Sequence, residues 1–260
     1  APGRAAEGQE LQQAGQLRVA VYADFPPYSN KGKGIDEAIG KELAKRIGLE
    51  AEVVEYTAGE DMNDDLRNMV WKGHYLGTRP SDVMLHVPVD QHLAKNNEQV
   101  KIFGAYHLET LAVVRNPARV PPMAGSAARG LEVFTREKIG VEGTSMADNF
   151  LLSVLNGRLR ENVVHFRTVD QAVAALKEGA VAAVMGTRGE IEAALGKDST
   201  YPISQATFPE LQIKGWAVGM AVKAESARLA EDLGKAIAEM QQDGTVARIF
   251  ADYGVTWQTP

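Results

Sequence analysis

The stretch from Leu17 to Leu49 constrains the fold most strongly, because it predicts a strand, a loop and a helix in immediate succession. Leu17–Val21 is a short, apolar, β-branched run of strand length. The loop ADFPPYSNKGKG contains two prolines, and neither a strand nor a helix continues through them. Asp36 is then the expected N-cap of a helix that ends at Gly48. The apolar residues of this helix recur at helical spacing: Ile35, Ile39, Leu43 and Ile47.

A further strand-like run, residues 51–56, follows the helix at once, so the unit is of the α/β type. In α/β sheets of this kind, ligands bind beyond the carboxyl ends of the strands. Asp24, Phe25 and Tyr28 fall there, directly after the first strand. Of these, Asp24 and Tyr28 are predicted ligand-binding residues.

The same alternation of strands and helices continues and then begins a second time after residue 115. The pattern predicts two α/β lobes, with Leu108–Arg115 and Lys214–Lys223 as the strands that cross between the lobes. It also predicts a loop that contains Arg188. Helices are predicted over residues 62–71, from the EGTS segment to residue 155, and over residues 170–178, 227–241 and 245–252. Strands are predicted over residues 82–87, 108–115, 138–141, 163–166, 181–186 and 215–223.

Composition and motifs exclude several kinds of function. The net charge of −6 argues against nucleic acid as a partner, and the absence of cysteine rules out disulfides and thiolate chemistry. No apolar run is long enough to span a bilayer. The chain begins with a polar arm, APGRAAEGQELQQAG, without an initiating Met. A removed secretory signal, and hence a periplasmic location, is expected, with a trimmed end as the alternative.

Several segments, in this order and spacing, carry a resemblance to a known family. They are VAVYADFPPYS with GIDEAIGKELAKRIG, DVMLHVPV, YHLETLAVVRNP, IGVEGTS, ALKEGAVAAVMG and AIAEMQQDGTVARIFADYG. Together they resemble bacterial periplasmic solute-binding proteins of the polar-amino-acid family, which serve ABC importers. The resemblance implies a Venus-flytrap fold with a discontinuous first lobe, residues 1–112 and 218–260, and a second lobe, residues 113–217. It also implies a monomer without catalytic activity that holds its ligand in the cleft between the lobes.

Two positions depart from the family pattern. Members that take amino acids hold the α-carboxylate with an Arg after the third strand, but the matching stretch here, HVPVDQHLAKNNEQ, contains no Arg. The family's acidic residue for the α-ammonium follows the strand that matches VAAVMG, and here Thr187 and Arg188 stand in that place. We therefore expect that ordinary α-amino acids do not bind.

Other residues are candidates for binding an anionic ligand. Gly143, Thr144 and Ser145 lie between a strand and a helix, where backbone N–H groups and the helix dipole favour an anion. The alternative is that Ser145 or Thr144 simply caps its own helix. Arg188 and Arg115 are candidates for carboxylate contacts, with a solvated side chain as the alternative in each case.

Aromatic residues and histidines complete the candidate site. Tyr28, Trp71, Tyr75 and Trp216 offer flat faces for stacking, and burial in a core or rim is the alternative for each. His74 lies beside Tyr75 in what looks like an insertion relative to the family. His86 ends an apolar strand, where a hydrogen-bonded core histidine is the alternative to a ligand contact.

A closer resemblance concerns the stretch NDDLRNMVWKGHYLG and the SDVMLHVPVD that follows it. It looks like the subgroup associated with quinoprotein alcohol dehydrogenases and pyrroloquinoline quinone. The implied ligand is then this flat polycarboxylate, taken up through an ABC permease or a TonB-linked system. The implied alternative is an accessory protein of a methanol dehydrogenase. A third hypothesis is a cyclic-acid dehydratase on the same fold. Its general acid and base would be His86 and either Asp90 or Glu109.

Overall fold

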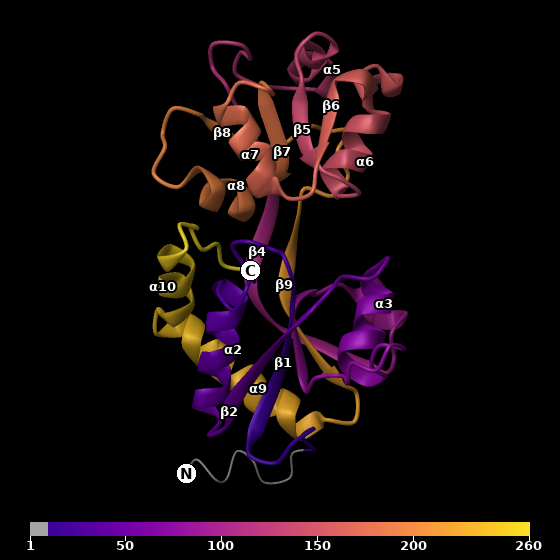
Figure 1. Cartoon of the computed structure of the whole chain (residues 1–260), viewed down its shortest axis with the longest axis vertical. Helices are drawn as coiled ribbons and strands as arrows, with labels where there is room; N and C mark the ends of the chain where they lie inside the picture. The colour runs from indigo at the N-terminus through magenta and orange to yellow at the C-terminus, as the bar shows by residue number, and fades with distance from the viewer. Residues whose placement is uncertain (1–9) are drawn as a thin grey trace. The chain divides into compact units, whose positions relative to one another are not determined.

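The computed structural model describes residues 10–260, which form two compact α/β units (Figure 1). Unit 1 comprises the described residues through Leu108, together with Trp216–Tyr253 and Trp257–Pro260. Unit 2 comprises Glu109–Gly215 and Gly254–Thr256. The chain thus changes unit after Leu108 and after Gly215, and again on either side of Gly254–Thr256. The family resemblance implies changes after residues 112 and 217. Residues 1–9 of the predicted polar arm lie outside the described residues.

The sheet of unit 1 has the strand order β2-β1-β3-β9-β4. Its central strand β1 pairs in parallel with β2 and β3, and β9 is antiparallel to β3. The three parallel strands therefore end on one edge of the sheet, which we call the carboxyl edge of unit 1. The strands are β1 (Gln16–Tyr22), β2 (Glu50–Tyr56), β3 (Val83–Pro88), β4 (Val100–Arg115) and β9 (Gly215–Lys223).

The helices of unit 1 cover this sheet. Helices α2, α9 and α10 pack against one another, and α3 lies on another flank of the unit (Figure 1). One turn of π-helix, η1, continues α3 without a break. The elements are α2 (Ile35–Arg46), α3 (Met62–Leu66), η1 (Arg67–Trp71), α4 (Gln91–Lys95), α9 (Ala227–Gln242) and α10 (Thr245–Asp252).

The first strand–loop–helix unit forms as the sequence predicts, apart from its cap. All four residues of the predicted apolar stripe of α2 are buried, and β1 is buried along its centre. The prediction of Asp36 as the N-cap is wrong. Gly34 is the N-cap, with φ of 140°, and Asp36 lies inside the first turn of the helix. Its carboxylate is fully buried and bonds to other side chains instead of capping the helix.

The sheet of unit 2 has the strand order β4-β7-β5-β6, with β8 paired to β4. Strand β5 is parallel to β6 and β7, so these three strands end on one edge, the carboxyl edge of unit 2. The strands are β5 (Ile139–Glu142), β6 (Val163–Phe166), β7 (Ala183–Thr187) and β8 (Ile203–Gln205). The α-helices are α5 (Ala127–Gly130), α6 (Met146–Ser153), α7 (Val169–Lys177) and α8 (Arg188–Leu195), and short 3₁₀ turns are η2 (Glu132–Thr135), η3 (Val154–Gly157) and η4 (Arg160–Asn162).

Two predictions for unit 2 are wrong in informative ways. Helix α6 stops at Ser153 and does not reach Leu155, because Leu155 and Asn156 take left-handed backbone angles with φ of 54° and 56°. The expected loop at Arg188 is instead the start of α8. The sequence held a signal for that helix, since Thr187 and Glu190 have the Thr-x-x-Glu spacing of a helix N-terminus.

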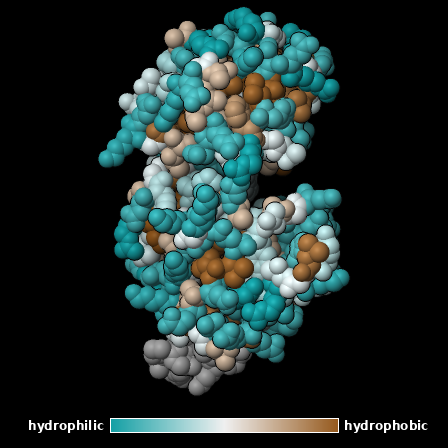
Figure 2. Space-filling view, viewed as in Figure 1, coloured by the Kyte–Doolittle hydropathy of each residue, from teal (hydrophilic) through white to brown (hydrophobic). Residues whose placement is uncertain are grey.

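The surface is that of a polar protein. The face drawn in Figure 2 is mostly hydrophilic, and its apolar patches are separated from one another. Within the described residues, no helix is long and apolar enough to cross a membrane.

Candidate functional site

The β1–α2 loop folds back onto the start of α2 at the carboxyl edge of unit 1. The backbone N–H of Phe25 donates to the carbonyl of Ser29 at 2.8 Å, which closes the loop on itself. The N–H of Asp36 then donates to the carbonyl of Tyr28, also at 2.8 Å. These bonds hold the predicted residues Asp24 and Tyr28 against the helix. Asp24 remains exposed, with φ of 54°, whereas Tyr28 is fully buried.

Three polar side chains from separate elements meet below this loop. His86 Nδ1 lies 2.9 Å from Asp36 Oδ2, and the Tyr106 hydroxyl donates to Asp36 Oδ1 at 2.7 Å. The backbone N–H of His86 donates to the same Tyr106 hydroxyl at 3.1 Å. Burial raises the pKa of Tyr106 well above its ordinary value, with Asp36 acting in the same direction, so Tyr106 remains a phenol donor. We call these residues the Asp36–His86–Tyr106 group.

Aromatic rings enclose the imidazole of this group. The Tyr28 ring centre lies 4.4 Å from that of His86, and the Phe25 ring meets His86 edge to face at 4.8 Å. Tyr28 is therefore packed inside unit 1 and has no face open for stacking on a ligand in this arrangement. Asp36 and Tyr106 are members of this cluster that the sequence did not single out as site residues. They come from positions that no local pattern connects.

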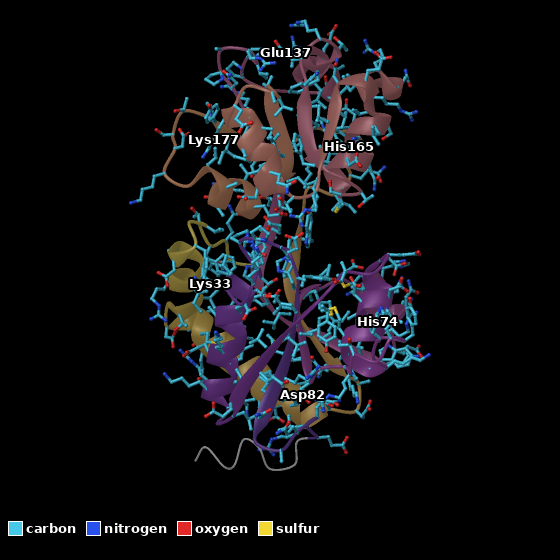
Figure 3. All side chains as sticks on the ribbon, in the orientation of Figure 1. Lys33, His74, Asp82, Glu137, His165 and Lys177 are labelled. Atoms are coloured by element: carbon cyan, nitrogen blue, oxygen red, sulfur yellow. The ribbon has the colours of Figure 1, made fainter. Side chains whose placement is uncertain are left out.

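Of the other aromatic candidates in unit 1, only Trp216 lies at the carboxyl edge in the described structure. Trp71 packs partly buried against an apolar core cluster. His74 and Tyr75 stack on each other at 4.6 Å in the loop between η1 and β3, on the α3 flank and away from Lys33 of the β1–α2 loop (Figure 3). Trp216 does lie at the carboxyl edge, because Ala217 accepts a hydrogen bond from Val89, just past the end of β3.

The predicted anion site in unit 2 is a turn whose donors bond within the protein. Gly143 N–H donates to Phe166 O at 2.9 Å, Thr144 N–H to Asp148 Oδ2 at 2.9 Å, and Ser145 N–H to Glu142 O at 3.3 Å. Ser145 is the N-cap of α6, so the capping alternative describes this arrangement. The turn holds the protein's own Asp148 carboxylate, which also contacts His165 Nε2 at 2.7 Å. It presents no vacant set of three donors.

Removal of this cap gives a direct stability prediction. Ser145 Oγ accepts a hydrogen bond from Asp148 N–H at 3.2 Å, so Ser145→Ala should lower the free energy of unfolding by about 1 kcal/mol. Ser153→Ala is the matched control, because Ser153 is exposed at the other end of α6 and bonds only to helix carbonyls. Urea denaturation followed by circular dichroism measures both. Equal losses in the two variants would contradict the capping role of Ser145.

The end of β7 is an acidic part of the same edge. Thr187 Oγ1 donates to Glu190 Oε1 at 2.6 Å, and Glu190 is buried. Burial raises the pKa of the Glu190 carboxyl well above its ordinary value, and the nearby carboxylates of Glu142 and Glu109 add to the rise, while Thr187 opposes it. Burial also raises the pKa of Glu142. The position after β7 holds Thr187 and Arg188 as the sequence shows, and Glu190 supplies a carboxylate three residues further along the chain, in the first turn of α8.

The two arginine candidates of unit 2 do not come together. Arg188 Nε lies 3.3 Å from Glu192 Oε1, an ion-pair contact without hydrogen-bond geometry, and about a third of the Arg188 side chain (34%) is exposed. Arg115 lies opposite Ala183 at the beginning of β7, while Thr187 ends that strand. Four residues of strand separate those two positions, which is roughly 13 Å. Arg115 Nη1 donates to Val120 O instead.

The candidate acid and base residues of a dehydratase all have other partners. His86 contacts Asp36, Asp90 Oδ2 accepts from Leu93 N–H as the cap of α4, and Glu109 Oε1 accepts from Gly189 N–H. In the part of the chain that the structure describes, no group of three or more His, Cys, Asp or Glu side chains is arranged to hold a metal ion.

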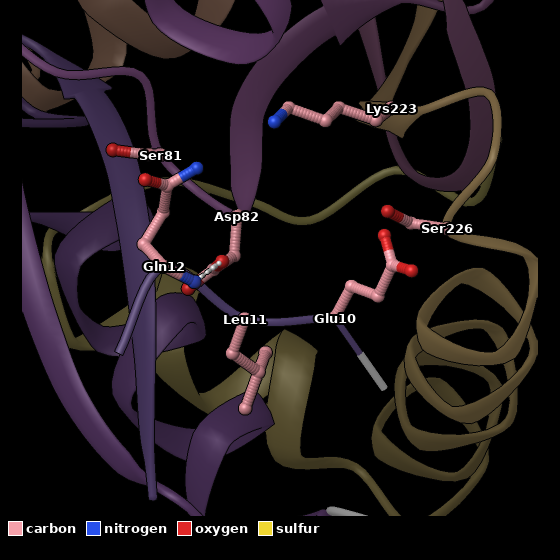
Figure 4. Close-up of a pocket in the computed structure, with 7 residues that line it drawn as sticks. All are labelled: Glu10, Leu11, Gln12, Ser81, Asp82, Lys223 and Ser226. Atoms are coloured by element: carbon pink, nitrogen blue, oxygen red, sulfur yellow. Dashed lines mark hydrogen bonds between the residues drawn. The ribbon is translucent and has the colours of Figure 1, made fainter. Parts of the chain in front are cut away.

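A polar cavity of about 260 Å³ lies at the opposite edge of unit 1, where β1 and β3 begin (Figure 4). Asp82 in its wall accepts hydrogen bonds from Gln12 N–H and Arg18 N–H, each at 2.7 Å. Lys223 also lines it. These bonds fasten the start of β1 to β3, so the role of Asp82 is structural.

Comparison with known proteins identifies the fold. The chain matches no protein-family model and no curated protein. An ancestral cationic amino acid solute-binding protein matches it with a TM-score of 0.69 at 16% identity, over 92% of this chain and 96% of that chain.

Two further solved structures agree with that match. The Salmonella typhimurium periplasmic binding protein with high arginine specificity matches with a TM-score of 0.63 at 16% identity, over 92% of this chain and 99% of that one. An amino acid ABC transporter substrate-binding protein from Streptococcus pneumoniae, bound to L-arginine, matches with a TM-score of 0.63 at 18% identity, over 92% and 94% of the two chains. The predicted fold class, that of two-lobed periplasmic solute-binding proteins, is thereby confirmed.

Proposed function

We propose that this protein is a solute-binding protein that captures a small molecule in the periplasm and delivers it to an ABC permease. The observation that carries the proposal is the likeness in fold to amino acid solute-binding proteins over 92% of this chain and 96% of the ancestral protein.

The ligand class best supported is an amino-acid-like molecule that carries a cation. The carboxyl edge of unit 2 holds Glu142 and buried Glu190, and Arg188 is paired with Glu192. A guanidinium or ammonium group near these carboxylates gains charge-assisted hydrogen bonds, whereas a second anion is repelled. The expectation that α-amino acids do not bind rested on a missing Arg after the third strand and a missing carboxylate at Thr187. Buried Glu190 offers a carboxylate near the second position, while the first departure stands. The three solved structures named above carry cationic amino acids or arginine in their descriptions.

Pyrroloquinoline quinone is the second candidate ligand. The observation that favours it is Arg188, which is part-exposed at the end of β7 where relatives of the polar-amino-acid family have an acid. Against it stand the occupied donors of Gly143–Ser145 and the burial of Tyr28. A quinoprotein dehydrogenase or a TonB-linked uptake system as partner depends on this second candidate alone.

Calorimetric titration distinguishes the two ligand classes. L-Arginine, L-lysine, agmatine and pyrroloquinoline quinone are titrated separately into the wild-type protein. We expect one of the cationic molecules to bind with a Kd in the micromolar range or below, about −8 kcal/mol or more favourable. At a hundredfold excess over Kd, the same ligand should stabilise the fold by about 2.7 kcal/mol in a thermal melt. Binding of the quinone alone would reverse the order of the candidates, and no binding by any of the four would contradict the proposed function.

A further inference from the structure

His86 leaves the extended backbone conformation of its strand. Its φ is +65°, in the left-handed region that only a few per cent of residues other than Gly adopt, with Asn, Asp and His the most frequent among them. The pairing of β3 with β9 shifts register between Leu85 and Val87, so His86 is the extra residue of a β-bulge. Bulges turn a side chain away from the direction that the regular strand dictates, and they occur often beside functional sites. Strained residues of this kind also cluster at ligand-binding positions.

The surrounding bonds determine which nitrogen of the neutral imidazole carries the hydrogen. An ionised carboxylate only accepts hydrogen bonds, so Asp36 Oδ2 requires a hydrogen on His86 Nδ1. Tyr106 donates to the other carboxylate oxygen and accepts from the His86 backbone, and this fixes both the ring and its strand. Among the residues that the structure describes, no Lys or Arg pairs with Asp36. The neutral ring therefore carries its hydrogen on Nδ1 and its lone pair on Nε2.

Nε2 is the one polar atom of this group without a partner in the described chain. It forms no hydrogen bond there and is not among the unpaired polar atoms that are buried. The side chain as a whole is only 12% exposed, because Phe25 and Tyr28 cover the ring. The exposed part of His86 is thus an acceptor atom at the carboxyl edge, where α/β sheets bind ligands. A purely structural role for His86 would need only the hydrogen bond at Nδ1. Such a role explains neither the β-bulge nor the solvent-accessible, unpaired Nε2.

We infer that His86 Nε2 accepts a hydrogen bond from a donor group of the ligand, and that Asp36 and Tyr106 are positioning residues that hold the accepting tautomer. The inference rests on the proposed function. The ligand's donor is an ammonium, guanidinium or other N–H group, because an acceptor such as a carboxylate meets the lone pair unfavourably.

The test uses His86→Asn in the full-length protein. Asparagine tolerates left-handed φ, and its side-chain N–H₂ can replace Nδ1–H as the donor to Asp36, but it has no atom in the place of Nε2. We expect at least about a tenfold increase in Kd for the cationic probe that the wild type binds, with an unchanged melting temperature. His92→Asn, at an exposed position of α4, is the matched control and should bind as the wild type does. His86→Gln, whose side-chain oxygen reaches toward the Nε2 position, should recover part of the affinity.

A second measurement does not depend on the variant folding. Long-range ¹H–¹⁵N correlation spectra of the wild type should show His86 with a hydrogen on Nδ1 and none on Nε2, and the Nε2 resonance should move when L-arginine is added. Equal affinities of wild type and His86→Asn, or an Nε2 that carries a hydrogen and does not respond, would overturn the inference while the proposed function stands. Failure of the wild type to bind L-arginine, L-lysine or agmatine would overturn the inference together with the cationic ligand class, and is recognised before any variant is measured. The proposed function itself fails only if the quinone does not bind either.

Discussion

Replacing Gly34 with alanine is expected to lower the free energy of unfolding by more than about 3 kcal/mol. Gly34 has φ of 140° and ψ of 178°, a backbone conformation that is essentially restricted to glycine. An added Cβ also meets the carbonyl oxygen of Tyr28, a backbone atom that cannot move aside without breaking its bond to Asp36 N–H. Both costs fall on the turn that aligns Tyr28 with the start of α2. The substitution therefore damages the Asp36–His86–Tyr106 group as well as the helix.

Gly32→Ala is the matched control for this substitution. Gly32 lies in the same loop with φ of 80°, but an added Cβ meets no atom within 4 Å. Its cost should be about 1 to 2 kcal/mol, from the left-handed conformation alone. Urea denaturation of wild type and both variants measures the difference. Equal destabilisation by the two alanines would mean that steric overlap at Gly34 is relieved by movement of the loop.

Glu190→Gln is expected to raise the free energy of unfolding near pH 7 by about 2 kcal/mol. A gain of this size is expected because burying a carboxylate without enough hydrogen bonds or opposite charge costs about that much. Glu190 is buried, and burial raises the pKa of its carboxyl well above the ordinary value of 4.5. Between the unfolded and folded pKa values, the folded state binds more protons than the unfolded state, so stability falls as pH rises through that interval. Glutamine does not titrate, and its amide oxygen can still accept from Thr187.

We expect Glu190→Gln to change both the free energy of unfolding and the slope of that free energy against pH. Wild-type stability should decline as pH rises above 4.5 toward the raised pKa, and the decline should be smaller in Glu190→Gln. Below pH 4.5 the two proteins should converge, because the carboxyl is then neutral in both folded and unfolded states. Glu161→Gln, at an exposed position of unit 2, should leave the slope unchanged. Parallel curves for wild type and Glu190→Gln would indicate that Glu190 is ionised in the folded protein without penalty.

Local periodicity predicts most elements of this fold, since hydrophobic spacing and turn residues act over a few positions. The stripe of α2, strand β6 and helices α9 and α10 lie within a residue or two of their expected bounds. Helix α8 was missed although its Thr187–Glu190 spacing is a start signal. The early end of α6 depended on the left-handed angles of Leu155 and Asn156, which composition alone does not specify.

The candidate site depended far more on contacts between distant segments. The order of elements placed Asp24, Tyr28, His86 and Arg188 after strands that share an edge within their unit, and this follows from the sequence because parallel strands end together. The same order did not show that Tyr28 is buried, or that the donors of the turn at Gly143 are occupied by the protein's own acceptors. Whether a polar group faces a ligand or a neighbour depends on packing, which local pattern does not encode.

By itself, the sequence therefore determined the α/β class, the repeated two-unit organisation and the apolar faces of the helices. Only the tertiary structure decided which polar atoms satisfy one another. Asp36, His86 and Tyr106 come from α2, β3 and β4, and they meet because the sheet brings those elements together. Glu190 becomes a buried carboxyl because α8 turns inward after β7. Hydrogen bonds reach only about 3 Å, so such partners are identified by position in space rather than by distance along the chain.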